Sequence, residues 1–214
     1  MRSMIGTNGR RVLLIIGLML SCTLLLQEAQ AQSKKKKPVE VKQSAVKTAK
    51  QEMSEHTDDL RTLMRTLYDA YPDELAKSTQ VGAREMTEWV FDGKASWRFE
   101  AIRGKQQTEA ISLVFDPEYK GDHILALVVG LETLLFNAYG GQNEYAIPVA
   151  QDESRLAHLR CQLEATQKLL DANPKQLAIL NEDSSRQNIR QTLESIIQRI
   201  SARVANKAVA NSSC

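Results

Sequence analysis

Residues 121–141 have the sequence GDHILALVVGLETLLFNAYGG, the most hydrophobic stretch in the last three quarters of the chain. Its apolar side chains surround a helix on nearly all sides, which predicts a buried central helix over 122–139. We expect Asp122 to cap the amino-terminal end and Gly140-Gly141 to end the helix in the left-handed conformation. Glu132 falls inside the stretch, which is shorter than the about 20 apolar residues of a membrane span. The pattern therefore favours a core helix over a transmembrane one.

Amphipathic helices are predicted on both sides of this central helix. Apolar residues spaced by three, four and seven predict a helix over about 53–70, which Pro72 ends. Beyond the central helix, two long apolar seams predict helices over about 152–173 and 185–208. We expect the solvated flank of the last helix to carry its arginines, which are Arg186, Arg190, Arg199 and Arg203. Because the link between them is short, we expect these two helices to pack antiparallel. The last seam could alternatively dimerise as a coiled coil, but it has only about two heptads where three to four are normally needed.

The segment 94–115 is compatible with two structures. The apolar residues between Trp97 and Ala101 alternate as in a strand, whereas those between Ala110 and Val114 have helical spacing. Short helices are also expected after Pro72 and from about Ala83. The whole pattern predicts a mainly α, single-domain helical bundle of about five to six helices with a basic, disordered amino-terminal arm. The expected organisation is a signal peptide over 1–31, a Lys-rich flexible arm over 32–50 and a helical domain over 51–214.

The first 31 residues have the order of a secretory signal peptide. Arg10 and Arg11 precede a run of 15 uncharged residues, and Ala29-Gln30-Ala31 follows. Small residues at positions 29 and 31 suit a signal peptidase, which predicts cleavage between Ala31 and Gln32. An uncleaved membrane anchor is the alternative, although the run is shorter than a usual span. The expected location is the periplasm or cell envelope.

A second alternative concerns lipid attachment. The segment Met19-Leu20-Ser21-Cys22 partly matches a lipobox, in which Cys22 would be lipid-modified and become the first mature residue. Met19 and Leu20 depart from the usual residues, and the apolar run continues past the cysteine. Conventional cleavage after Ala31 is therefore preferred. Arg10-Arg11 also resembles a twin-arginine signal, but Gly9 replaces the usual hydroxyl residue.

Charge is distributed unequally along the chain. The formal net charge is only +2. Residues 32–50 nevertheless carry seven Lys and one Glu, whereas residues 51–214 carry 18 basic and 24 acidic side chains. A folded nucleic-acid-binding face would be basic, so no nucleic-acid partner is expected. The block Lys34, Lys35, Lys36 and Lys37 is either a solvated spacer, which we favour, or a contact with an anionic envelope surface.

Two cysteines remain if the signal is removed, Cys161 and Cys214. An even number of cysteines in an exported protein predicts a disulfide between them. Two separate thiols, or an intermolecular bond through the terminal Cys214, remain as alternatives. No Cys-x-x-Cys pair is present, which disfavours thioredoxin-like chemistry.

Signatures of catalysis are missing from the sequence. It has neither His-Glu-x-x-His, a Gly-x-Ser-x-Gly elbow, a phosphate-binding loop nor a dinucleotide fingerprint, so no catalytic residue, metal ligand or cofactor is predicted. Asp122-His123 is the best polar pair, and we interpret it as a capping residue beside a histidine. The competing hypothesis is a small metal-dependent or hydrolytic site formed by Asp122, His123 and His158.

Glu132 and a set of aromatic residues are the remaining candidates. If Glu132 is buried, it should have a raised proton affinity or a basic partner, and a structural ion pair is the favoured outcome. The aromatic residues either frame a groove for sugars or peptides or belong to the core, which we favour. They are Trp89, Trp97, Tyr119, Tyr139 and Tyr145.

The segment from Gly121-Asp122-His123 to Asn137-Ala138-Tyr139-Gly140-Gly141, behind a signal peptide, resembles small uncharacterised exported or lipoprotein families of Gram-negative bacteria. The resemblance covers about the middle third of the chain. It implies an envelope setting and a mostly helical fold, and it supplies no catalytic residue.

The sequence therefore predicts an exported, non-enzymatic binding or scaffold module of the bacterial cell envelope. Its expected partner is an envelope protein or an anionic envelope surface, with membrane contact only peripheral or through a lipid on Cys22. A small periplasmic enzyme and a helical subunit or assembly factor of an envelope complex are the alternatives. The oligomeric state is left open.

Overall fold

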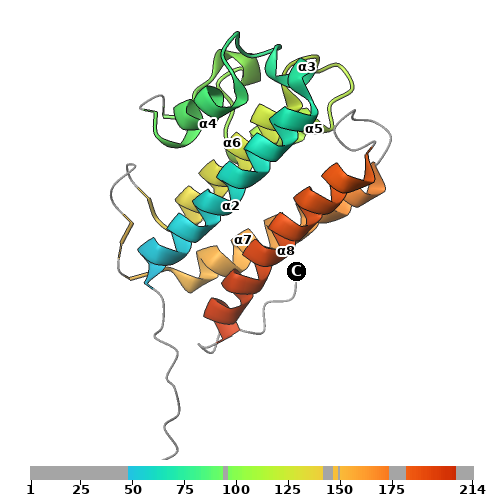
Figure 1. Ribbon diagram of the computed structural model, residues 1–214. Helices are drawn as coiled ribbons and strands as arrows, with labels where there is room; N and C mark the ends of the chain where they lie inside the picture. The colour runs from blue at the N-terminus through green and yellow to red at the C-terminus, as the bar shows by residue number, and fades with distance from the viewer. Residues whose placement is uncertain (1–47, 94–95, 142–146, 149, 174–181, 206–214) are drawn as a thin grey trace, which may run out of the picture. The chain divides into compact units, whose positions relative to one another are not determined.

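A computed structural model describes residues 48–93, 96–141, 147–148, 150–173 and 182–205. These residues all belong to the unit Lys47–Cys214, and this unit is described on its own. The described part contains seven α-helices and one 3₁₀ turn and has no strand, so the predicted mainly α bundle is confirmed (Figure 1). The elements are α2 (Ala49–Ala70), α3 (Pro72–Leu75), α4 (Ala83–Phe91), η1 (Glu100–Ile102), α5 (Gln107–Val114), α6 (His123–Ala138), α7 (Glu153–Ala172) and α8 (Asp183–Ala205).

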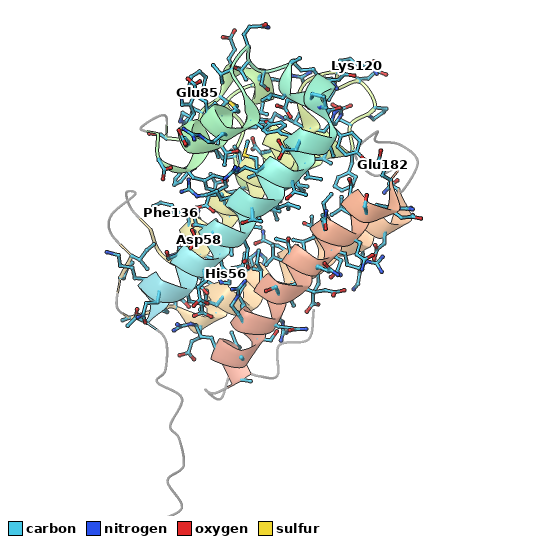
Figure 2. All side chains as sticks on the ribbon, in the orientation of Figure 1. His56, Asp58, Glu85, Lys120, Phe136 and Glu182 are labelled. Atoms are coloured by element: carbon cyan, nitrogen blue, oxygen red, sulfur yellow. The ribbon has the colours of Figure 1, made fainter. Side chains whose placement is uncertain are left out.

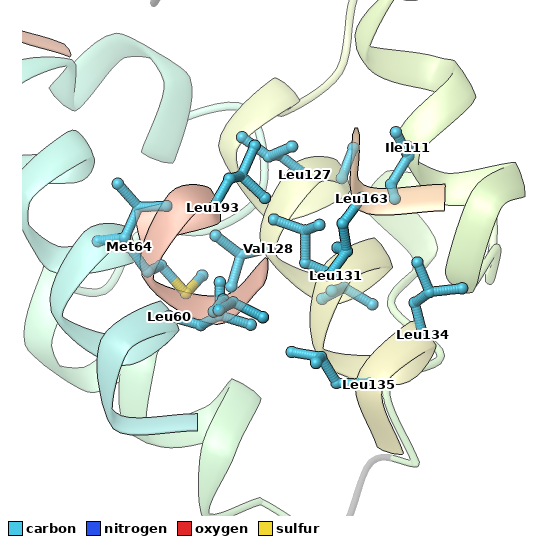
Figure 3. Close-up of a cluster of buried hydrophobic side chains, with 14 of the residues drawn as sticks. Leu60, Met64, Ile111, Leu127, Val128, Leu131, Leu134, Leu135, Leu163 and Leu193 are labelled. Atoms are coloured by element: carbon cyan, nitrogen blue, oxygen red, sulfur yellow. The ribbon is translucent and has the colours of Figure 1, made fainter. Parts of the chain in front are cut away.

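The predicted central helix is α6, and it lies among α2, α3, α5 and α7. Its residues from Ile124 to Leu135 are all buried. Figure 3 shows leucines of α6 meeting Leu60 and Met64 of α2 and Leu163 of α7. A helix that is apolar on nearly all sides is stable only where neighbours cover every side. Truncating one of these leucines to Ala should cost about 2–5 kcal/mol of stability.

Helix α2 begins earlier than expected. Thr48 forms a capping box with Gln51: the Thr48 hydroxyl accepts the Gln51 N–H at 3.2 Å, and the Gln51 side chain accepts the Thr48 N–H at 2.9 Å. This exchange satisfies two N–H groups that a helix start leaves free. Helix α2 therefore starts at Ala49, within the range expected for the arm. Its end before Pro72 and the short helix α3 agree with the prediction.

The ambiguous segment after α4 contains no strand within its described residues. The alternation that begins at Trp97 leads instead into η1, which ends at Arg103 in the left-handed conformation with φ 57°. Gly104 follows with φ 63°. The helical interpretation of the second half is confirmed by α5.

Helices α5 and α6 approach closely because residue 130 is glycine. A Cβ on Gly130 would lie 2.6 Å from Cγ1 of Ile111 and 2.9 Å from the carbonyl oxygen of Gln107. Gln107 begins α5 in the left-handed conformation with φ 51°. Its N–H donates to the hydroxyl of Thr133 at 2.7 Å, which ties the start of α5 to α6.

Helices α7 and α8 pack antiparallel, as predicted (Figure 1). Arg190 pairs with Asp171, and one turn further Gln167 donates to Glu194 at 3.3 Å. The numbering falls along α7 while it rises along α8, so the helices run in opposite directions. The apolar seam of α8 is buried in this chain's own core.

The arginines of α8, which the amphipathic pattern placed on a solvated flank, have a further role. Arg199 pairs with Asp59, and Arg203 pairs with Glu52, both on α2. These two arginine side chains are only 23% and 21% exposed. Helix α8 is therefore held between α7 and α2, with its charged side chains contributing to the contact.

Several features fall outside this description. In the described residues, every helix is too short or too polar to cross a bilayer. The predicted signal peptide with its cleavage site, the four consecutive lysines of the predicted arm, Cys22, Tyr145 and Cys214 lie outside the described residues. Of the two closing glycines, Gly140 has the expected left-handed backbone with φ 74°.

Candidate functional site

A buried polar cluster surrounds the amino-terminal end of α6. Asp122 is completely buried and caps the helix, as predicted: its Oδ1 accepts the Leu125 N–H at 2.8 Å. Its Oδ2 accepts the hydroxyls of Tyr68 and Ser78, each at 2.7 Å. Burial raises the pKa of Asp122, and these hydrogen bonds oppose the rise. Asp122 therefore ties α2 and the segment after α3 to the start of α6.

The neighbouring His123 is held by a carboxylate from α3. Glu74 Oε2 accepts the backbone N–H of His123 at 2.9 Å and lies 3.1 Å from its Nδ1. Its Oε1 accepts Lys77 Nζ at 2.6 Å. Burial alone would raise the pKa of Glu74, but the hydrogen bonds from His123 and Lys77 outweigh it and lower the pKa to about 2. Glu74 is therefore ionised and orients the imidazole.

Tyr119 covers the other side of this histidine. The two rings meet edge to face, with centroids 5.1 Å apart and an interplanar angle of 77°. The Tyr119 hydroxyl donates to the carbonyl oxygen of Ala101 at 2.9 Å, and burial raises the pKa of Tyr119. With Nδ1 on Glu74, Nε2 of His123 is the ring nitrogen that has no hydrogen-bond partner among the described residues.

A pocket of about 450 Å³ opens beside this histidine. Figure 2 shows Lys120 at the end of the helical unit where α3 lies, whereas His56 lies on the part of α2 beside α8. Lys120 Nζ donates to the carbonyl oxygen of Pro117 at 2.6 Å. The pocket combines apolar and cationic side chains with one carboxylate. Its lining consists of Lys77, Val114, Phe115, Asp116, Pro117, Tyr119, Lys120 and His123.

The hypothetical site formed by Asp122, His123 and His158 is wrong. His158 is exposed on α7 and lines a different pocket, of about 360 Å³, together with Asn137 at the opposite end of α6. Since α6 has 16 residues and rises about 1.5 Å per residue, its two ends are about 24 Å apart. The structure brings His123 to Glu74 instead. No group of three or more candidate metal ligands is present in the described part of the chain.

Glu132 is buried as expected, but without the favoured ion pair. Its Oε1 accepts the Thr57 hydroxyl at 2.9 Å, while Oε2 has no hydrogen-bond partner among the described residues. Arg61 binds Asp92 through both of its terminal nitrogens, at 2.7 and 2.8 Å. Burial raises the pKa of Glu132 to about 7, against the opposing effects of Thr57 and Arg61. The raised pKa agrees with the proton affinity expected of a buried carboxyl group, and no ion pair of Glu132 is found among the described residues.

The cysteine and aromatic predictions have mixed outcomes. Cys161 is half-buried on α7, and because Cys214 lies outside the described residues, their pairing stays a prediction. Tyr119 and Tyr139 are core residues as favoured, whereas Trp89 is 44% exposed on α4.

The sequence did not indicate Glu74, Lys77 or Lys120 as site residues. Only contacts between segments far apart in the chain reveal their roles.

Comparison with known proteins finds no family model, no curated protein and no solved structure that matches the chain.

Proposed function

We propose that this chain is an exported, non-enzymatic binding module of the bacterial cell envelope, and that it binds its ligand in the pocket beside His123. The basic, apolar and small-residue order of positions 1–31 supports export. The observation that carries the binding site is the pair Glu74 and His123. A buried carboxylate accepts the backbone N–H of His123 and contacts Nδ1 of its imidazole, and Nε2 remains for a ligand at the pocket wall. Preorganised polar groups beside apolar surface are typical of small-molecule sites.

The use of nearby hydroxyl groups favours binding over turnover. Ser78 donates its hydroxyl to Asp122, and Tyr119 donates its hydroxyl to a backbone carbonyl. The lining of the pocket contains no Ser, Thr or Cys that His123 could activate as a nucleophile. The imidazole is therefore better placed to hold a ligand than to start acyl or phosphoryl transfer.

The alternative of a small hydrolytic enzyme is favoured by one observation, the orientation of His123 by Glu74. A carboxylate on Nδ1 leaves Nε2 able to accept a proton from water. The alternative of an assembly subunit that pairs through α8 has less support. The seam of α8 is covered by helices of the same chain, so pairing with another chain would require α8 to separate from them.

The export part is tested by expressing the full chain in a Gram-negative host and measuring the mass of the product in each cell fraction. We expect a periplasmic species whose first residue is Gln32. A chain retained in the cytosol with its leader would overturn export. A lipid-modified product that starts at Cys22 would show that the chain is processed as a lipoprotein and is not cleaved after Ala31.

The non-enzymatic part of the proposal is tested by measuring hydrolysis of nitrophenyl esters and phosphates, which are generic hydrolase substrates, with the purified protein. We expect no turnover above that of a His123→Gln variant. Turnover that His123→Gln abolishes and His158→Gln retains would establish the hydrolytic alternative. His158→Gln is a matched control because His158 is exposed on α7, in a different pocket that includes Asn137 from the opposite end of α6.

A further inference from the structure

We infer that the pocket beside His123 binds a small organic monocarboxylate with an apolar body. This inference rests on the proposed function and specifies its ligand class. It follows from the charge balance of the pocket, the apolar part of its lining and the free nitrogen of the imidazole.

The charge balance favours a ligand with a single negative charge. Lys77 and Lys120 contribute two positive charges, and Glu74 and Asp116 contribute two negative charges. With His123 neutral, these groups cancel. Protonation of His123 adds one positive charge, which a monoanion would neutralise. Two further charged groups lie near this site but outside the pocket lining: the Arg103 guanidinium lies over the Tyr119 ring, 5.6 Å from its centroid, and Asp122 is bound by Tyr68 and Ser78.

Both carboxylates of the site accept hydrogen bonds from within the chain, while its lysines keep N–H donors for a ligand. Glu74 accepts hydrogen bonds from Lys77 and from two atoms of His123. Asp116 accepts the backbone N–H of Glu118 at 2.9 Å. Each lysine ammonium has three N–H donors, and the structure uses one on Lys77 and one on Lys120. A carboxylate at the pocket wall can therefore accept from Nε2–H of protonated His123 and from a lysine.

The apolar lining favours an organic anion over inorganic phosphate. Phe115 is half-buried and Pro117 is exposed, so both present apolar surface to the pocket, whereas Val114 in the same lining is already fully buried. A volume of about 450 Å³ is within the usual range of small-molecule sites, which is about 300–1,000 Å³. A fully hydrated dianion would leave this apolar surface uncovered, whereas a ring or short alkyl chain would bury it.

The binding experiment uses 4-fluorobenzoate as the probe and 4-fluorobenzamide as its neutral isostere. Fluorine NMR of the probe and proton NMR of the histidine rings report binding to the purified mature chain. We expect benzoate to shift the ring protons of His123 and leave those of His158 unchanged. Its affinity should exceed that of the amide about tenfold, because only the carboxylate can accept a charge-assisted hydrogen bond from His123 and a lysine.

Three single substitutions test which side chains of the pocket contact the carboxylate of the probe. We expect His123→Gln to weaken benzoate binding about fivefold to tenfold, because the charge-assisted hydrogen bond is lost. Lys120 is exposed, so Lys120→Gln should preserve the fold and weaken binding about twofold to fivefold. His158→Gln should bind like the wild type.

The outcomes separate the ligand class from the proposed function. Equal binding of amide and benzoate at His123 would overturn the monocarboxylate assignment and leave the pocket as a binding site. Tighter binding of inorganic phosphate than of benzoate would do the same. If neither fluorinated probe nor phosphate perturbs His123, both the ligand class and the binding function of this pocket are overturned.

Discussion

Glu74 and His123 are 49 positions apart in the chain, yet one carboxylate oxygen of Glu74 contacts both the backbone N–H and Nδ1 of His123. This contact fastens the four-residue helix α3 to the first turn of the central helix α6. The same imidazole ring meets the ring of Tyr119 edge to face. A helix as short as α3 has little stability of its own, so this tertiary contact maintains it.

Replacing Glu74 by Gln should lower stability at neutral pH and have little effect in acid. The folded-state pKa of Glu74 is about 2, below its ordinary value of 4.5. Its ionised form therefore stabilises the fold above about pH 4.5, and this contribution is lost as the pH falls toward about 2. We expect Glu74→Gln to cost roughly 1–3 kcal/mol at pH 7 in urea unfolding. A difference that is constant between pH 7 and pH 3 would contradict the prediction.

Glu132 should have the opposite pH dependence. Its folded-state pKa is about 7, above its ordinary value of 4.5, because burial disfavours the carboxylate. The unfolded chain therefore loses this proton first, and stability falls as the pH rises from about 4.5 to about 7. Glu132→Gln removes the titrating group, so the wild type should lose roughly 1–3 kcal/mol relative to the variant across this range.

Urea unfolding of both proteins at several pH values measures the effect of Glu132. Glu109→Gln is the control, since Glu109 is an exposed glutamate of α5. Parallel stability curves for the wild type and Glu132→Gln would show that Glu132 ionises normally in the folded state.

Gly130→Ala should destabilise the crossing of α5 and α6. The added methyl group would lie 2.6 Å from Ile111 and 2.9 Å from a backbone oxygen of Gln107, so α5 has to move. We expect a loss of roughly 1–3 kcal/mol by thermal or urea unfolding. Gly82→Ala is the matched control, because a Cβ at Gly82 meets no atom within 4 Å. Equal losses for the two variants would exclude close packing as the cause.

The two capping aspartates should differ in importance. Asp122→Ala removes a helix cap and leaves the hydroxyls of Tyr68 and Ser78 without their acceptor inside the fold. The expected loss is roughly 2–4 kcal/mol. Asp152 caps α7 with hydrogen bonds to Ser154 and Arg155, but it is exposed. Asp152→Ala should therefore have a smaller effect, and the reverse order would contradict the role of burial.

The predicted pairing of Cys161 with Cys214 is open to direct measurement. We expect tryptic peptides of the non-reduced, exported protein to contain these two residues joined by a disulfide. The bond should be absent from Cys161→Ser and Cys214→Ser variants, which should also be less stable. A covalent dimer that survives in Cys161→Ser and disappears in Cys214→Ser would establish the intermolecular alternative instead.

The sequence by itself determined the helical elements, because hydrophobic periodicity and stop signals act locally. The apolar run around Leu127 predicted α6, Asp122 its cap and Pro72 the end of α2. The alternation after Trp97 left strand and helix open, because burial in an irregular segment can alternate without strand pairing. Burial of Glu132 followed from its apolar neighbours, which is also a local property.

Only the tertiary structure decided which polar groups share a site. Histidine and carboxylate pairing depends on distances in space, and neither spacing nor composition connects Glu74 with His123 or separates His123 from His158. The same holds for Arg199 and Arg203, which amphipathic periodicity placed in solvent and packing placed against α2. Local patterns specify helices because backbone hydrogen bonds are local, whereas a site forms from side chains that the packing of those helices brings together.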